Sequence, residues 1–179
     1  MHKAISIIQF KLEGQLILSH PDFDMNDRLL LDKIDYARGV LLLDGQEYPL
    51  RDKAFPTIDP ANPYALTPEE EELVNRLHAS FVNSEKLRKH MRCLFSNGSM
   101  YLVRNNNLLY HASIPLNEDG SFKEVAIDGK KYKGKPLLDK LDQMIRLAYY
   151  GVDSPEKQYA LDYIWYLWCG ADAPSFGKD

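Results

Sequence analysis

Three Asp-Gly dipeptides, at residues 44–45, 119–120 and 128–129, place the tightest constraint on how this chain can fold. Asp-Gly readily adopts the positive φ angles of a two-residue hairpin turn, so each dipeptide predicts a sharp reversal of the chain. Apolar residues before the first dipeptide and a short extended segment after it predict an antiparallel hairpin over residues 40–50.

Two further hairpins are expected in the second half of the chain. The later Asp-Gly turns predict that residues 122–127 pair with residues 130–133. A third hairpin is predicted with strands at 100–103 and 108–114 and a turn at 104–107. Adjacent antiparallel strands of this kind need no crossover helices, which argues against a parallel sheet within this chain.

Helical patterns separate the hairpins. The 3-4 spacing of apolar residues predicts a helix over 4–18, interrupted or ended near Gly14, and a short helix over 25–34. Residues 67–70, Thr-Pro-Glu-Glu, form the sequence signature of a capping box, which predicts a helix start. That helix is expected to break near residues 83–84, where Ser84 can cap a second helix.

Two more helices are predicted near the C-terminal end. Pro136 opens an amphipathic segment, and Ser154-Pro155 opens a helix that Gly170 can terminate. Residues 51–66 carry three prolines and no periodicity, which predicts an extended surface loop or lid.

The order of elements predicts an α+β fold in which amphipathic helices pack on antiparallel hairpins. We expect a single segment over 1–179, with helices, a hairpin and a Pro-rich loop in 1–66. Residues 67–179 would hold helices and the hairpin that carries His111. The apolar 3-4 pattern begins almost at residue 1 without a cap, so we expect that residue to mark a cut within a longer protein.

Composition excludes some classes of function. Apolar residues make up 45% and charged residues 27%, and the net charge is −4, so there is no basic excess for nucleic acid. No apolar run is long enough for a membrane span, and the N-terminal segment does not fit a signal peptide, which favours a cytoplasmic protein. Cys93 and Cys169 are predicted to be free thiols that form no zinc site.

The residues that could perform chemistry are few. Phosphate-binding glycine loops, H-E-x-x-H, G-x-S-x-G and calcium-loop motifs are absent from the sequence. The run 86–92 contains Lys86, Arg88, Lys89 and Arg92, which could bind a phosphate ester, although a solvated helix face is the simpler interpretation.

His111 is the most notable of the five histidines. It follows Asn107–Tyr110, at the predicted end of a buried apolar strand, where a neutral imidazole could bind a metal. A histidine in this position is also commonly a hydrogen-bonded structural residue, and the residues alone leave both alternatives open.

Several long strings of residues stand in an order typical of one enzyme family: Ile8–Glu13, Asp27–Asp35, Ser84–Leu87 with His90 and Met91, Met100–Leu102, Asn107–His111 with Ile114 and Pro115, and Trp165–Trp168 with Phe176–Lys178. On these strings the whole chain resembles a segment of the class III fructose-1,6-bisphosphatases, the type found in Firmicutes. Members of that family are several times longer and are similar to the calcineurin-like metallophosphoesterases.

The resemblance implies a larger α/β metallophosphatase that hydrolyses fructose 1,6-bisphosphate to fructose 6-phosphate in gluconeogenesis. Two divalent cations, expected to be Mn²⁺, would activate a water. The family's D-x-H, G-D-x-x-D and G-N-H-D motifs are absent here, and His111 matches the one later metal-binding histidine that this segment should contain. Ala112 departs from the glycine that usually follows it.

The resemblance therefore predicts a segment that is inactive alone and binds no metal tightly. In the alternative interpretation the segment is a non-catalytic cap, oligomerisation module or ligand-binding module, and His111 is structural. A natural short protein is a third interpretation. A free segment would expose apolar surface on its first helix and around Trp165 and Trp168, which predicts self-association.

Overall fold

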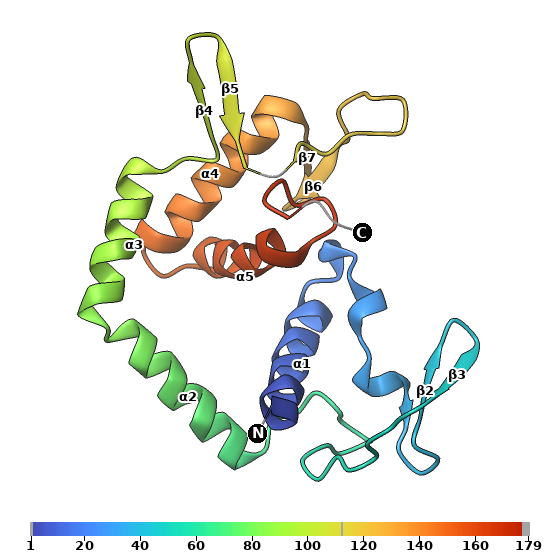
Figure 1. Cartoon of the computed structure of the whole chain (residues 1–179). Coiled ribbons are helices and arrows are strands. Elements are labelled where there is room, and N and C mark those ends of the chain that lie inside the picture. The colour runs from blue at the N-terminus through green and yellow to red at the C-terminus, as the bar shows by residue number, and fades with distance from the viewer. Residues whose placement is uncertain (1, 112, 177–179) are drawn as a thin grey trace. The chain divides into compact units, whose positions relative to one another are not determined.

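The computed structural model describes residues 2–111 and 113–176 and divides the chain into two compact units, Met1–Asn83 and Ser84–Asp179 (Figure 1). The predicted α+β class is confirmed, because helices alternate with small antiparallel sheets. The sequence-based division after residue 66 stays a prediction.

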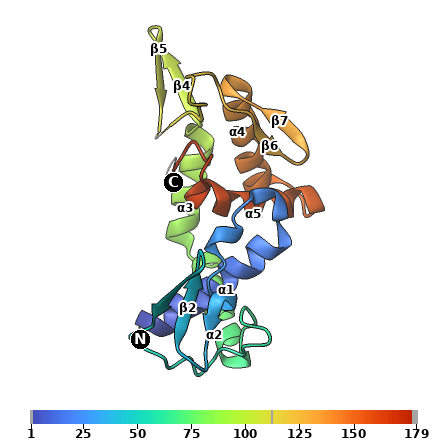
Figure 2. The ribbon, with the colours of Figure 1, turned by 90° about the vertical axis from the view of Figure 1, so that its right-hand side faces the viewer.

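The described part of the first unit contains helices, short 3-10 turns and one antiparallel sheet. They are α1 (His2–Ser19), η1 (Pro21–Phe23), η2 (Asn26–Arg28), η3 (Leu31–Lys33), β1 (Ile34–Asp35), β2 (Val40–Leu43), β3 (Gln46–Pro49) and α2 (Pro68–Val82). The strand order is β1-β2-β3. The predicted Asp-Gly hairpin is confirmed, with φ angles of 50° at Asp44 and 75° at Gly45. Figure 2 shows β2 on the side of the first unit that faces the viewer.

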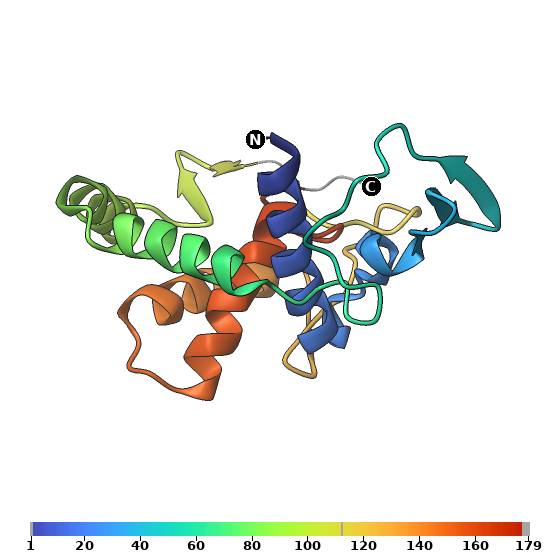
Figure 3. The ribbon, with the colours of Figure 1, turned by 90° about the horizontal axis from the view of Figure 1, so that it is seen from below.

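Helix α1 does not stop at Gly14, so the predicted interruption there is wrong (Figure 3). Gly14 is buried, and a Cβ added to it would lie 2.1 Å from the ring of Tyr64. The amide of Gln15 also donates to the carbonyl oxygen of Tyr64 at 2.6 Å. The glycine therefore serves close packing of the 51–66 segment on the helix, and it does not end the helix.

The predicted helix over 25–34 is also wrong. This segment forms the 3-10 turns η2 and η3 and then enters β1. The buried side chains are Met25, Leu29 and Leu31. Leu29 and Leu31 are two residues apart and cannot share one face of an α-helix, so burying both favours tighter turns.

Helix α2 begins as predicted. The backbone N–H of Glu70 donates to the Thr67 hydroxyl at 3.3 Å, and the Glu70 carboxylate accepts from the N–H of Thr67 at 2.9 Å. This reciprocal pair is a complete capping box. The helix ends at the predicted break, and Ser84 caps the next helix by accepting from the N–H of Leu87.

The described part of the second unit contains α3 (Glu85–Asn97), β4 (Tyr101–Arg104), β5 (Asn107–Tyr110), β6 (Val125–Ile127), β7 (Lys130–Tyr132), α4 (Gly134–Tyr150) and α5 (Pro155–Cys169). The core forms where α4 packs against α5. The predicted apolar face of α4 is buried at Leu137, Leu138, Leu141, Met144 and Ala148. Ser154 caps α5, and the N–H of Gly170 closes its last turn by donating to Tyr166.

Candidate functional site

The β4–β5 hairpin carries the candidate metal ligand. Tyr101 pairs with Tyr110, Leu102 with Leu109 and Val103 with Leu108. The predicted hairpin is confirmed, but its turn is only Asn105-Asn106 and its second strand ends at Tyr110. Asparagine tolerates the left-handed conformation, so two consecutive positive φ angles, 50° and 61°, are accommodated without glycine.

The hairpin is exposed, so the prediction of a buried strand is wrong. Leu102 and Leu109, which form one cross-strand pair, are 54% and 53% exposed, and Val103 of the adjacent pair is 59% exposed. The hairpin extends away from α4 and α5 (Figures 1 and 2). Within the described part of the second unit, no element covers either face.

His111 follows the last residue of β5 and is exposed. Its position one residue beyond Tyr110 agrees with the prediction of a histidine at a strand end. Ala112, the predicted departure from the family pattern, lies outside the described residues, as do Gly177 and Lys178 of the last matching string.

In the parts described, 2–111 and 113–176, no three His, Cys, Asp or Glu side chains gather as a cation would require. One imidazole falls short of the several ligands that hold a divalent ion. The described residues therefore form no group that could by itself hold a cation.

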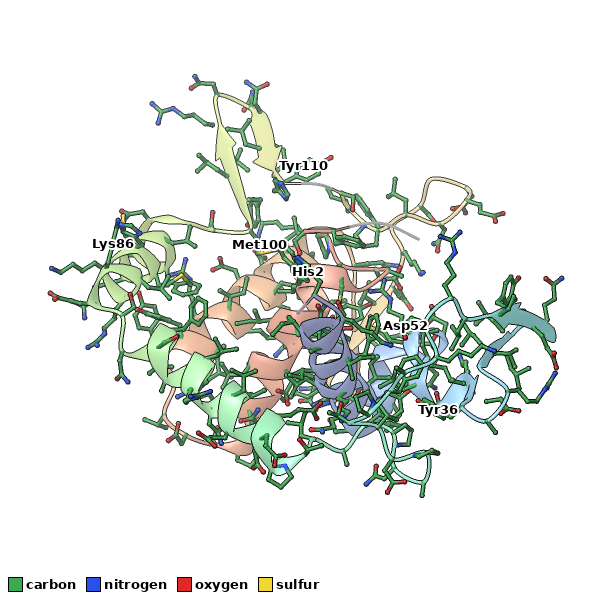
Figure 4. The ribbon with its side chains drawn as sticks, turned by 60° about the horizontal axis from the view of Figure 1, so that its bottom comes forward. His2, Tyr36, Asp52, Lys86, Met100 and Tyr110 are labelled. Carbon is green, nitrogen blue, oxygen red and sulfur yellow. The ribbon has the colours of Figure 1, made fainter. Side chains whose placement is uncertain are left out.

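The candidate phosphate-binding residues lie on α3. Lys86, Arg88, Lys89 and Arg92 are all exposed, and Figure 4 shows Lys86 directed outward from the helix. Lys89 forms an exposed ion pair with Glu85 at 2.8 Å. This is the solvated helix face described above as the simpler interpretation, and phosphate binding by these residues stays a prediction.

A polar face of α4 holds the start of the hairpin, and the sequence reasoning did not identify it. The hydroxyl of Tyr101 donates to Asp139 at 2.8 Å, and Lys135 donates to the other carboxylate oxygen at 2.6 Å. The hydrogen bond from Lys135, followed by that from Tyr101, lowers the pKa of Asp139. The same bond to Asp139 raises the pKa of Lys135 to about 12.

One turn further along α4, Asp142 and Arg146 form a second group of contacts. The Asp142 carboxylate accepts from the N–H of Met100 at 3.3 Å and from Arg146 Nε at 2.8 Å. The Arg146 guanidinium also donates to the carbonyl oxygens of Phe95 and Gly98, at 2.8 and 2.9 Å. It thereby satisfies carbonyls at the end of α3. The three- and four-residue spacing of 135, 139, 142 and 146 places these charged residues on one helix face, and this spacing could have indicated the polar face of α4 from sequence.

A buried ion pair in the first unit also escaped the sequence reasoning. Lys11 on α1 is fully buried, and its Nζ lies 2.7 Å from a carboxylate oxygen of Glu70 and donates to the carbonyl of Thr57. Burial tends to raise the pKa of Glu70. Hydrogen bonds from Lys11, the Thr57 contact and the N–H of Thr67 outweigh that effect, so the pKa is lowered.

The cysteines and the apolar segments of the sequence can also be compared with the structure. The two cysteines form no disulfide bond with each other. Over the described residues, no helix has the length and apolar character needed to cross a bilayer.

Helices and short antiparallel hairpins define an α+β segment, and its described residues contain no group of three side chains that could hold a metal ion. The family model described as Firmicute fructose-1,6-bisphosphatase matches residues 1–179, and the chain belongs to that family.

Curated relatives named fructose-1,6-bisphosphatase class 3 match the whole chain. Those from Bacteroides fragilis, Bacteroides thetaiotaomicron and Clostridium beijerinckii are 67%, 63% and 61% identical to it. The chain spans 27% of the length of each of these relatives. No solved structure matches the chain.

Proposed function

We propose that this chain is a segment of a fructose-1,6-bisphosphatase, an enzyme that hydrolyses fructose 1,6-bisphosphate to fructose 6-phosphate and phosphate. The observation that carries the proposal is the match of the whole chain, at 67% identity, to a curated relative of that name. The reaction belongs to gluconeogenesis, and the enzyme would act in the cytoplasm on a soluble sugar phosphate.

His111 is the residue of this segment that we assign to the metal centre. Its support is the match to the family's histidine pattern and its position at the end of β5. Divalent cations, Mn²⁺ in this proposal, would activate water and stabilise charge on the phosphoryl group. The other ligands would come from the parts of the family's sequence that this chain does not span.

The exposed basic residues on α3 are the proposed contacts to a phosphate group. Lys86, Arg88, Lys89 and Arg92 offer positive charge on one helix. Their support is charge alone, because neutralising a phosphate ester requires cationic donors.

The experiment compares the purified 179-residue chain with a chimera. In the chimera, this chain replaces the matching segment of the Bacteroides fragilis relative. Both proteins are assayed for phosphate release from fructose 1,6-bisphosphate with Mn²⁺. The proposal expects turnover by the chimera and none by the isolated chain. Turnover by the isolated chain near the rate of the intact relative would contradict it, and so would a folded but inactive chimera.

A non-catalytic assembly module is the second candidate, and the exposed hairpin favours it. Leu102, Val103 and Leu109 would then be contact residues and His111 would be structural. Replacement of His111 by alanine in the chimera separates the candidates. Loss of turnover with an unchanged melting temperature supports a ligand, whereas unchanged turnover supports the module.

A further inference from the structure

We propose that Asp139, Asp142 and Arg146 are positioning residues that fix the base of the β4–β5 hairpin and thereby the place of His111. The relevance of that place to catalysis rests on the proposed function. The positioning itself rests on contacts within the second unit.

The first contact acts through the strand pair. Asp139 accepts from the hydroxyl of Tyr101, the first residue of β4. Tyr101 is the cross-strand partner of Tyr110, the last residue of β5, and His111 is the next residue. The hydrogen bond between Asp139 and Tyr101 therefore reaches His111 in two steps: the pairing of Tyr101 with Tyr110, and the peptide bond from Tyr110 to His111.

The second contact fixes the backbone just before the hairpin. Asp142 accepts from the N–H of Met100, and Arg146 donates to the carbonyl oxygens of Phe95 and Gly98. These contacts attach both the end of α3 and Met100, the residue that precedes β4, to helix α4. Figure 4 shows Met100 at the foot of the hairpin.

The segment after His111 is tied independently. The N–H of Ser113 donates to the carbonyl oxygen of Pro174 at 2.9 Å. Lys123 pairs with Asp172 at 2.7 Å, beside that segment. His111 therefore lies between two attachments, one to α4 and one to the segment after α5.

The hairpin needs such attachments because it lacks other support in the described residues. A two-stranded hairpin alone is marginally stable in water, and both faces of this one are exposed. The core side of α4 is apolar and packs on α5, so the Asp139–Arg146 face is the part of α4 that remains available to hold the hairpin.

The first test is hydrogen exchange measured by mass spectrometry on the 179-residue chain. Asp142→Ala removes the two carboxylate oxygens that accept from the N–H of Met100 and from Arg146. This variant is expected to speed exchange over residues 101–111 about tenfold, with exchange in α5 unchanged. Asp142→Asn keeps an acceptor for Met100 and should give an intermediate rate. Asp153→Asn is the matched control, because Asp153 forms the same i,i+4 type of pair with Lys157 but is fully exposed. Unchanged exchange over 101–111 in Asp142→Ala would overturn the proposal.

The second test is a double-mutant cycle in the chimera with the relative. Asp142→Ala is expected to lower kcat about tenfold, with little change in KM, when His111 is present. In the His111→Ala background the same change should have less than about a twofold effect, because it acts through His111. Equal effects in both backgrounds would overturn the functional part of the proposal. If His111→Ala alone leaves kcat unchanged, the proposed function of His111 fails, and the exchange experiment still decides whether α4 positions the hairpin.

Discussion

Lys11 and Glu70 form an ion pair of 2.7 Å between α1 and the start of α2, and both side chains are buried. The Glu70 carboxylate also accepts from the N–H of Thr67, so one carboxylate caps α2 and attaches it to α1. The pair therefore joins two segments of the first unit that lie 59 residues apart.

Replacing Lys11 with methionine is expected to destabilise the first unit by about 3–5 kcal/mol, because the Glu70 charge stays buried without its partner. The measurement is urea unfolding followed by circular dichroism. Lys3→Met is the matched control on the same helix. Lys3 pairs with the exposed Asp52, and loss of such a pair costs about 0–1 kcal/mol. Equal losses for the two variants would contradict a special role for Lys11.

The pair also makes stability depend on pH. The pKa of Glu70 is lower in the folded chain than its ordinary value, because the hydrogen bonds from Lys11 and Thr67 outweigh the effect of burial. Its contribution is fully present above the unfolded pKa of about 4.3 and is lost as pH falls through the lower folded pKa. Unfolding free energies measured from pH 6 to pH 2.5 should fall less steeply in Glu70→Gln than in the parent chain. Parallel curves would contradict this.

Replacing Gly14 with alanine should destabilise the chain, although alanine normally favours a helix by about 1 kcal/mol. The added Cβ would lie 2.1 Å from the ring of Tyr64, a buried residue whose hydroxyl donates to the Asp32 carboxylate at 2.8 Å. Relief therefore requires moving a packed ring, and we expect a loss of about 1–3 kcal/mol. Ser6→Ala, at an exposed position of the same helix, is the control. An increase in melting temperature for Gly14→Ala would contradict the packing described.

Features determined by a few neighbouring residues could be predicted from the sequence. Asp44-Gly45 forms the expected hairpin, and Thr67 and Glu70 form the expected capping box. Asp128-Gly129 also turns a hairpin, but its strands, 125–127 and 130–132, are shorter than predicted, and Phe122 pairs with Leu116 instead. These outcomes depend on local backbone geometry and on hydrogen bonds that span three residues.

Features determined by distant partners could not be predicted. The sequence around Gly14 is typical of a helix end, but the glycine in fact makes room for the ring of Tyr64, 50 residues further along the chain. A lysine such as Lys11 is normally expected at the surface, and it is buried here because Glu70 pairs with it. The apolar pattern of the β4–β5 hairpin predicts burial, but the side chains of its strands are largely exposed. At the candidate site, sequence located His111 but not the Asp139–Arg146 face that supports its hairpin.

The exposed hairpin predicts self-association of the 179-residue chain. Leu102, Val103 and Leu109 present apolar surface to solvent, as do Trp168 at 79% exposure and Leu18 on the first helix at 56%. Sedimentation velocity should show association that increases with protein concentration. Val103→Lys with Leu109→Lys should reduce it, whereas Lys130→Glu, at an exposed polar site, should not. A monomer at every concentration would contradict the prediction.

The assignment of His111 is the central claim, and its most direct test is the kcat of the chimera on fructose 1,6-bisphosphate with Mn²⁺. His111→Ala should lower kcat by at least about 100-fold, since even loss of an outer-shell partner of a metal ligand costs 10–100-fold. His78→Ala, at an exposed position on α2, is the matched control and should leave kcat within about twofold of the parent. A folded His111→Ala chimera with the same kcat as the His78→Ala control would contradict the account.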